Sequence, residues 1–481
     1  MLFTDTSFAV FLPIVFALYW LLQRAPKWQN ALVLVASYVF YGWWSWRFLL
    51  LIAFTSLCSY VSGIKMGTGE NVGKAAHRKL WLWANIVINL GILAIFKYYD
   101  FFVAELAQLF GLDGDPLMLH VALPVGISFY TFQALSYSID VYKGRVEPTR
   151  NIVAFFAYIA FFPQLVAGPI ERATQLLPQF LRSRHFDYKL AIDGARQILW
   201  GLFKKMVVAD NCASYVDAVF AQSQGPASHL LAAVLFAFQI YGDFSGYSDI
   251  AIGTAKLFGI RLMQNFRTPY FSRDIAEFWR RWHISLTTWF RDYVYIPLGG
   301  SRVPKWKVVR NTFVIFLLSG IWHGANWTFV AWGGYHACLF LPLILLGRNR
   351  RYTNTVAAGR LLPTWKELGQ MTLTFALVAF GWVVFRATGI PSALAFIRTM
   401  CHPEAISAAW MFFADSGISV ARVGIIVMLV VEWLQRDKEH GLQDADRVVR
   451  NRWLRYLLFA ALFVATYFFR GAYTEFIYFQ F

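Results

Sequence analysis

The sequence feature that most constrains the fold is a nearly unbroken apolar segment, residues 311–346. Apolar residues run from Thr312 to Leu318 and again from Phe329 to Leu346. An α-helix crosses the hydrocarbon core of a bilayer with about 20 apolar residues, so this segment is long enough to span a membrane. Because similar runs recur along the chain, the sequence predicts an all-α, polytopic integral membrane protein.

The composition supports this class. Of the 481 residues, 58% are hydrophobic and only 15% are charged, which is outside the range of soluble domains. The length allows about 11–13 membrane-embedded helices. The net charge of the chain is +17, and its basic residues lie in short loops between apolar runs. Basic residues are typical of cytoplasmic loops and of contacts with anionic lipid head groups, which explains this charge better than binding to nucleic acid does.

The chain is predicted to form a single transmembrane domain, residues 1–481. Its parts are N-terminal helices (1–112), a catalytic core with re-entrant or interfacial helices (113–347) and C-terminal helices (348–481). Lys97–Leu112 is amphipathic and is predicted to lie on the membrane surface. The predicted crossings are Phe8–Leu22, Ala31–Trp46, Phe48–Ile64, Leu80–Phe96, Val121–Val141, Ile152–Ala167, Leu230–Ile252, residues 311–346, Met371–Phe385, Val423–Leu434 and Trp453–Phe469.

Several classes of site have no sequence signal here. The four cysteines are scattered without a CxxC pair, so neither a disulfide framework nor a zinc site is predicted. The chain has no Walker-type phosphate loop, no G-x-S-x-G and no H-E-x-x-H motif. We therefore expect no metal, no bound cofactor and no ATP-driven pump.

Two histidines, His323 and His336, lie inside the apolar segment. A titratable group at membrane depth is costly and indicates function. In one continuous helix these residues would be about 20 Å apart along the axis and rotated by about 220°, so only one of them is expected to do chemistry. We favour His323 as the general base or acyl relay, with Trp322 and Asn326 shaping and orienting the site. The alternative is a histidine that hydrogen-bonds a backbone carbonyl between packed helices.

A second group lies in residues 277–283. On a helix, Glu277 and Arg281 form an i,i+4 pair, while Arg280 and His283 share a face. Such cations suit a phosphate or a phosphopantetheine-type donor at the cytoplasmic side. The alternative interpretation is a lipid-head-group anchor with an internal salt bridge.

A third group is polar and lies in an apolar neighbourhood. Asp243, Ser245 and Asp249 suit hydrogen bonds to an acceptor sugar or to the catalytic histidine. The two carboxylates are six residues apart, about 240° around a helix, which does not support a glycosidase-like pair. Polar contacts between helices are the alternative.

Residues 161–172 contain Pro163, Gly168 and Pro169 inside an apolar run, which predicts a broken helix. Broken helices at membrane depth persist where they line a cavity. A structural kink is the favoured interpretation, with Glu171 and Arg172 as a gate or an ion pair.

In order along the chain, these stretches resemble the bacterial branch of the membrane-bound O-acyltransferase (MBOAT) family, the alginate and polysaccharide O-acetyltransferase subgroup in particular. The resemblance extends over almost the whole chain. The stretches that carry it are residues 1–3 with 11–13, 36–41, 123–130, 162–170, 243–249, 278–286, 320–325 and 476–481.

The resemblance implies more than the residues alone. It implies that His323 matches the family's invariant histidine and His283 its second functional histidine. It implies a ring of helices around a central tunnel, which joins a cytoplasmic donor side to an outer acceptor side. It also implies transfer of an acetyl group, with acetyl-CoA as the donor, across the bacterial inner membrane to an exopolysaccharide such as alginate or to a cell-wall polymer. A periplasmic acetyltransferase is the implied partner.

Other functions remain open at this stage. A D-alanyl or other acyl transferase would use the same histidines. A transporter of a polymer or lipid would move substrate without acyl chemistry and tolerate His323→Ala. A non-catalytic scaffold of a secretion complex would tolerate loss of either histidine.

Overall fold

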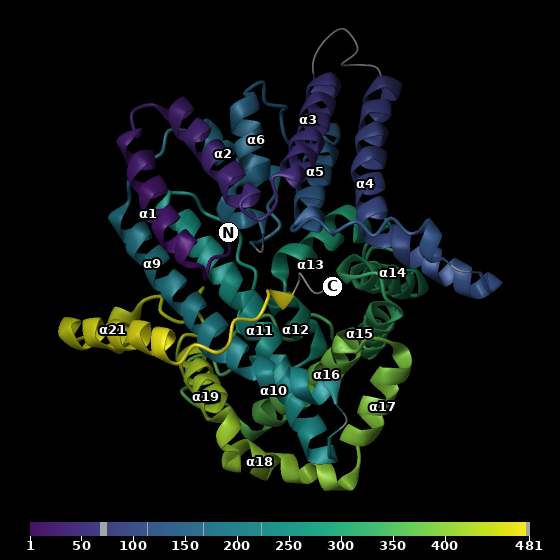
Figure 1. Cartoon of the computed structure of the whole chain (residues 1–481), viewed down its shortest axis with the longest axis vertical. Helices are drawn as coiled ribbons and strands as arrows, with labels where there is room; N and C mark the ends of the chain where they lie inside the picture. The colour runs from purple at the N-terminus through teal and green to yellow at the C-terminus, as the bar shows by residue number, and fades with distance from the viewer. Residues whose placement is uncertain (68–74, 113, 167, 223, 478–481) are drawn as a thin grey trace. The chain divides into compact units, whose positions relative to one another are not determined.

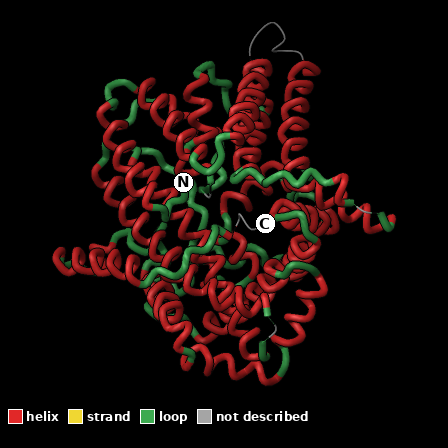
Figure 2. The backbone as a smooth tube through the Cα atoms, viewed as in Figure 1, coloured by secondary structure: helices red, strands yellow, loops and turns green. Residues whose placement is uncertain are grey.

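The described chain is built from helices joined by loops. A computed structural model describes residues 1–67, 75–112, 114–166, 168–222 and 224–477. Within these ranges there is no β-strand (Figure 2). The predicted all-α class is confirmed.

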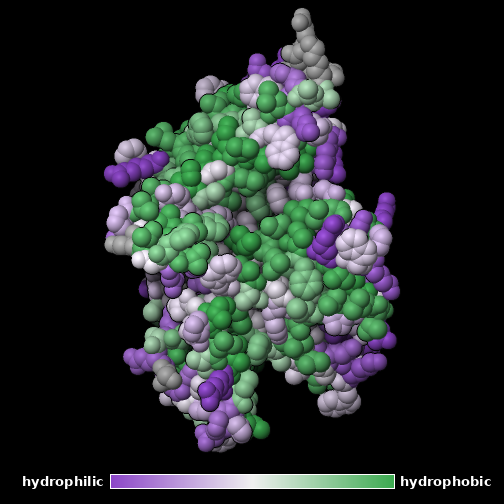
Figure 3. Space-filling model, turned by 90° about the vertical axis from the view of Figure 1, so that its right-hand side faces the viewer, coloured by the Kyte–Doolittle hydropathy of each residue, from purple (hydrophilic) through white to green (hydrophobic). Residues whose placement is uncertain are grey.

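Six helices among the described residues are long and apolar enough to cross a membrane, and three shorter apolar helices accompany them. Figure 3 shows broad areas of apolar side chains on the face that it presents. The six lie at Arg47–Gly67, Ala75–Phe110, Pro226–Leu257, Trp327–Leu345, Trp365–Arg386 and Ser416–Leu434. The chain is therefore a multi-pass membrane protein, while the central tunnel stays a prediction.

The described residues pack into two compact units. Unit 1 comprises residues 1–195 and 251–263, and unit 2 comprises residues 196–250 and 264–481. The helices α9 (Tyr188–Phe203) and α11 (Pro226–Leu257) contribute residues to both.

Unit 1 contains the N-terminal helices (Figure 1). Its remaining elements are α1 (Thr6–Leu21), α2 (Pro26–Gly42), α3 (Arg47–Gly67), α4 (Ala75–Phe110), a 3₁₀ turn η1 (Asp115–Leu117), α5 (Ile127–Tyr142), α6 (Ile152–Ala160), α7 (Phe162–Leu165) and α8 (Ala173–Leu181). Helix α4 is continuous through the predicted crossing and the predicted surface helix that follows it. Polar side chains tie its neighbours together: the Ser59 hydroxyl of α3 donates to Asn85 of α4 (3.1 Å), and Asn85 donates to Ser138 of α5 (2.7 Å).

The predicted helix break within residues 161–172 is confirmed. Helix α6 ends at Ala160 and α7 starts at Phe162, with Pro163 in its first turn. Proline is tolerated there because its missing N–H would be unpaired in a first turn anyway. The Glu171 carboxylate accepts a hydrogen bond from the Met263 backbone N–H (2.6 Å), and burial raises the pKa of Glu171 to about 8.

Unit 2 holds the other elements. They are a π-helical turn η2 (Lys204–Ala209), α10 (Asp210–Ala221), η3 (Pro269–Phe271), α12 (Ile275–Arg281), α13 (Ile284–Phe290), a second π-helical turn η4 (Arg291–Tyr295), α14 (Lys305–His323), α15 (Trp327–Leu345), α16 (Trp365–Arg386), α17 (Ile390–Met400), η5 (Pro403–Ser407), α18 (Ala408–Ala414), η6 (Ser416–Ile418), α19 (Ser419–Leu434), α20 (Ala445–Val448) and α21 (Arg452–Phe468).

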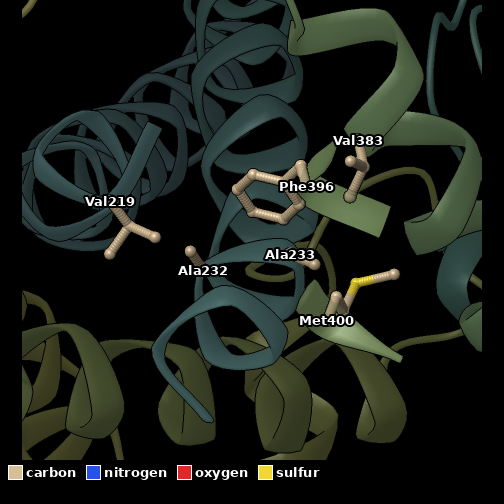
Figure 4. Close-up of a cluster of buried hydrophobic side chains, with 6 residues drawn as sticks. All are labelled: Val219, Ala232, Ala233, Val383, Phe396 and Met400. Atoms are coloured by element: carbon tan, nitrogen blue, oxygen red, sulfur yellow. The ribbon is translucent and has the colours of Figure 1, made fainter. Parts of the chain in front are cut away.

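An apolar cluster joins α10, α11, α16 and α17 in unit 2 (Figure 4). Phe396 of α17 stacks on Phe220 of α10, with ring centroids 4.3 Å apart. Offset stacking adds about 0.5–1.5 kcal/mol to the burial of the rings themselves. The cluster consists of Val219, Ala232, Ala233, Val383, Phe396 and Met400.

Helix α21 makes few contacts within its unit. It projects away from the other helices of unit 2 in Figure 1, and Thr466 is its one buried residue. Its 17 residues include exposed aromatic and aliphatic side chains from end to end. The predicted last crossing at Trp453–Phe469 stays a prediction.

The central apolar segment is two helices, not one. Helix α14 ends at His323, Gly324 is extended, and α15 starts at Trp327. The two helices pack closely because Gly320 of α14 and Gly333 of α15 lack side chains: a Cβ atom on either would overlap a backbone carbonyl of the opposite helix. The break overturns the single-helix geometry, so the spacing of His323 and His336 is set by packing.

Candidate active site

The end of α14 is fixed by Asn326. Its side-chain oxygen accepts a hydrogen bond from the Thr328 backbone N–H (3.0 Å), which caps the first turn of α15. Its amide group donates to the Thr388 carbonyl (2.9 Å), beyond the end of α16. Asn326 therefore holds the break that follows His323, and these contacts are structural ones.

His323 is buried at the last position of α14 among aromatic rings. Its ring centroid lies 5.0 Å from Trp322, 5.2 Å from Trp332 and 5.2 Å from Phe385. Rings from α14, α15 and α16 therefore fix the orientation of the imidazole. The surroundings are apolar, which suits a neutral imidazole that acts as a base.

His283 lies between α12 and α13 in a left-handed conformation, with φ of 43°. A non-glycine residue there stores strain of about 1–3 kcal/mol, and such strain persists only where the surroundings impose it. Asn265 supplies part of that constraint: its carbonyl accepts from the Ile284 N–H (2.9 Å) and its side chain accepts from the Ser285 hydroxyl (2.9 Å). Asn265 also donates to Ser248 of α11 (3.0 Å).

The ring of His283 is enclosed like that of His323. Only 1% of the residue is exposed, and its ring centroid lies 4.7 Å from Phe244 and 5.9 Å from Trp322. Burial lowers the pKa of His283 to about 3, so the imidazole is neutral at physiological pH. Trp322 therefore contacts both His283 and His323. The two predicted catalytic histidines therefore contact the same indole ring.

The basic residues predicted at positions 277–283 lie in two different environments. Glu277 and Arg281 form the expected i,i+4 ion pair (2.9 Å), and Arg273 shares the same carboxylate (3.0 Å). Arg280 is exposed and donates to the backbone carbonyls of Asn349 and Tyr352 (2.8 and 2.6 Å). The shared helical face predicted for Arg280 and His283 is wrong, because α12 ends at Arg281 and His283 leaves the helical conformation.

The two aspartates of α11 are both ion-paired. Asp243 lies 2.7 Å from the Lys205 ammonium group, and Asp249 lies 2.6 Å from Lys204. Gln197 donates a further hydrogen bond to Asp249 (2.8 Å). The consecutive lysines belong to the π-helical turn η2, and π-helical turns are common at functional sites. The carboxylates therefore neutralise buried lysines, whereas a role toward substrate stays a prediction.

The Lys205 ion pair also holds the end of the described chain. The Asp243 carboxylate accepts from the Ile477 backbone N–H (2.7 Å), and Lys205 donates to the Thr474 carbonyl (3.0 Å). The ring of Phe476 packs on Phe244, which in turn contacts His283 (ring centroids 5.9 and 4.7 Å apart). Ser245 is buried, and its hydroxyl has no hydrogen-bond partner among the described residues.

A pocket of about 480 Å³ lies in unit 2, between residues of α12, α13, α14 and α15. Its volume falls in the range of sites for small molecules and cofactors. Arg280, Arg291 and Arg350 contribute cations to the lining, and all three are exposed. Neither histidine lines the pocket, but Ile284 follows His283 directly and Ser319 precedes His323 by one helical turn, so the lining includes residues of the elements that carry both histidines.

Several known proteins are similar to this chain in sequence. Residues 148–380 match the family model described as MBOAT, membrane-bound O-acyltransferase family. The chain is 43% identical over 397 residues to the "Probable alginate O-acetylase AlgI" of Pseudomonas aeruginosa, covering 82% of this chain and 73% of that protein. The chain belongs to the membrane-bound O-acyltransferase family.

A second relative, the protein of the same name from Pseudomonas putida, is 39% identical over 503 residues, which span both chains completely. The "Peptidoglycan O-acetyltransferase" of Helicobacter pylori is 34% identical over 428 residues, covering 82% of this chain and 79% of that protein.

This protein is therefore a membrane O-acyltransferase, and its histidine pair has the properties that acyl transfer needs. A neutral imidazole accepts the proton of an attacking hydroxyl and returns it to the leaving group. Aromatic rings bury both histidines, and a buried site limits the access of water, which would otherwise compete for an acyl donor. Among the described residues, no cluster of three or more His, Cys, Asp or Glu side chains is placed to hold a metal ion.

Sequence reasoning missed several buried residues that pack around the candidate site. Glu432 of α19 is one: it accepts from the Tyr241 hydroxyl (2.9 Å) and lies 3.8 Å from Lys204. The sequence could have indicated Glu432, because it is a carboxylate inside an apolar run. Lys204, Lys205 and Asn265 gave no such signal, because the lysines resemble an interfacial basic run and the asparagine resembles a loop residue.

Proposed function

We propose that this acyltransferase carries an acetyl group from a cytoplasmic donor across the bacterial inner membrane, for O-acetylation of a cell-envelope polymer. The names of the relatives support this proposal, because they refer to an alginate O-acetylase and a peptidoglycan O-acetyltransferase. The acceptor is an exopolysaccharide of the alginate type or a cell-wall polymer. A separate periplasmic acetyltransferase receives the acetyl group from the membrane enzyme and completes the transfer.

The observation that carries the proposal is the histidine pair around Trp322. In the proposed reaction, a neutral His323 imidazole takes the proton of the acceptor hydroxyl as its oxygen attacks the acyl carbonyl carbon. The carbon–sulfur bond of a thioester donor then breaks, and the departing thiolate takes the proton back from the imidazolium. His283, also neutral and in contact with the same indole, assists by holding the donor.

The donor we propose is acetyl-CoA, bound as a substrate and not as a resident cofactor. The pocket in unit 2 combines exposed arginines with an apolar interior, which suits phosphate groups attached to a long thioester arm. Arg280, Arg291 and Arg350 are the cations that would face the phosphates. Arg281 contributes indirectly, since its pairing with Glu277 stabilises α12.

The test measures ester-linked acetyl groups on exported polysaccharide and on peptidoglycan. Three strains are compared: wild type, a deletion, and the deletion carrying His323→Ala at the native level. The proposal expects His323→Ala to match the deletion while the variant protein remains in the membrane in normal amount. The polymer that loses its acetyl groups identifies the acceptor.

Two outcomes would redirect the proposal. Loss of ester-linked D-alanine with acetyl groups intact would make the enzyme a D-alanyl transferase. Normal acetylation in His323→Ala would remove the catalytic assignment and favour a transporter or a scaffold.

A further inference from the structure

One wall of the pocket in unit 2 is made of two interlocked aromatic rings. Trp279 of α12 and Phe316 of α14 line the pocket, and both side chains are buried, in contrast to the exposed arginines of the lining. Their ring centroids lie 5.3 Å apart in an edge-to-face arrangement. Close-packed rings of this kind do not move aside for an extra methylene group without cost.

The far side of this wall is also filled. His336 of α15 lies 5.0 Å from Trp279 and 6.4 Å from Phe316 between ring centroids, and it is fully buried. Neither of its ring nitrogens has a hydrogen-bond partner in the described part of the chain. Gly381 of α16 leaves space there, since a Cβ atom at this position would lie 3.0 Å from Nε2 of His336.

The wall also lies next to the reacting group. Trp332 contacts Trp279 on one side and His323 on the other, with ring centroids 5.6 and 5.2 Å apart. Trp332 does not line the pocket, so it connects the wall to His323 through these two ring contacts, and a donor arm that extends from the pocket toward His323 would pass along the wall. The room beyond the thioester carbonyl is set by the position of these rings.

We propose that Trp279 and Phe316 form an acyl stop, which restricts the enzyme to short acyl groups such as acetyl. The inference rests on the proposed function, because it assumes that the pocket receives the acyl donor. Discrimination against one extra methylene group in a hydrophobic pocket is about 10- to 200-fold. The stop is thus a specificity determinant, and His336 is part of the packing behind it.

The experiment supplies membranes, together with the periplasmic fraction and the acceptor polymer, with an equimolar mixture of acetyl-CoA and butyryl-CoA, each carrying a different isotope label. Ester-linked acyl groups are released from the acceptor polymer with mild base and counted by mass spectrometry. Wild-type membranes are expected to transfer acetyl in at least about tenfold preference to butyryl. Trp279→Ala is expected to reduce this preference about tenfold, by opening space toward His336.

Phe290→Ala is the matched control, because it also removes a buried aromatic ring that lines the same pocket, but one that belongs to α13 and packs on Trp289. It is expected to lower transfer of both acyl groups in proportion, with the preference unchanged. His336→Phe keeps a ring behind the stop and is expected to retain the wild-type preference.

If Trp279→Ala does not accumulate, Phe316→Leu carries the same test with a smaller change of volume. The inference is overturned if variants of Trp279 and Phe316 transfer acetyl with the wild-type preference, or if the wild type transfers both groups equally. Absence of any acetyl transfer by the wild type would instead overturn the proposed function, and the acyl stop with it.

Discussion

His323 and His336 share Trp332 as a neighbour, yet their surroundings differ in kind. His323 ends a helix, next to a turn held by Asn326, and it contacts the same indole ring, that of Trp322, as His283 does. His336 lies in the middle of α15, enclosed by rings of its own and neighbouring helices. Both histidines are buried.

The difference shows that burial of a histidine in an apolar segment does not by itself identify the reactive group. A helix end beside a turn offers an approach to a substrate, and a second histidine nearby offers a partner. The middle of a packed helix offers neither. The following predictions test this contrast and the contacts that support the surroundings of the histidines.

The largest effect is expected from the histidines themselves. His323→Ala should reduce acetyl transfer about 10²- to 10⁴-fold, the usual contribution of general acid–base catalysis. His336→Phe should keep activity within about threefold, because it preserves volume and removes two unpartnered nitrogens. Acetyl ester content per amount of membrane-inserted enzyme measures both.

Equal loss in the two variants, at equal protein level, would erase the contrast. A large loss in His336→Phe alone would exchange the roles of the histidines. His336→Gln, which retains a polar group, would then decide between chemistry and packing.

The next effect concerns buried polar groups that do have partners. Lys205 neutralises both Asp210 and Asp243 (2.7 Å each), so Lys205→Met should cost about 3–5 kcal/mol by leaving two buried carboxylates without a cation. Asp243→Asn should cost less, because Lys205 keeps its pair with Asp210. Survival of the detergent-solubilised enzyme after heating, followed by size-exclusion chromatography, ranks the two variants.

Combining the substitutions sharpens that result. The double variant Lys205→Met with Asp243→Asn should be less destabilised than the sum of the single variants, as expected for contacting partners. Strict additivity would show that this ion pair contributes nothing to the fold near His283.

A third prediction uses pH to test the protonation state of His283. Burial lowers the pKa of His283 to about 3, so its folded form stays neutral when an unfolded chain would take up a proton near pH 6.5. Its contribution to stability is therefore full above pH 6.5 and is lost as pH falls from 6.5 toward 3, by at most about 1.4 kcal/mol per pH unit. The melting temperatures of wild type and His283→Phe are compared at pH 7.5 and 5.5. The difference between the two proteins should be smaller at pH 5.5.

The same property predicts the activity profile. His283 should add no acid limb between pH 5 and 8, so His283→Gln should lower the rate without changing the shape of its pH dependence. A limb near pH 6.5 that disappears in His283→Gln would mean that this imidazole takes up a proton in the folded enzyme.

Much of this site was accessible from sequence because its signals are local. The i,i+4 pairing of Glu277 with Arg281 follows from helix geometry, and a histidine in an apolar run is visible without any structure. The Lys205–Asp243 pair is different, since 38 positions separate its members and no periodicity joins them. The left-handed turn at His283 was also hidden, because the helical pattern continues through it and Asn265 imposes the break from a distant loop.

The smallest predicted effect tests the turn that distinguishes His323 from His336. Removing a capping side chain costs about 0.5–2 kcal/mol, so Asn326→Ala should lower stability modestly. Asn451→Ala is the matched control: it removes the cap of α21, where Asn451 accepts from the Trp453 N–H (2.9 Å), in a helix with almost no buried residue. Both variants should lose similar stability, but only Asn326→Ala should reduce acetyl transfer, because it alone loosens the break that follows His323. Equal activity in the two variants would mean that the rings around His323 fix the imidazole without help from the cap.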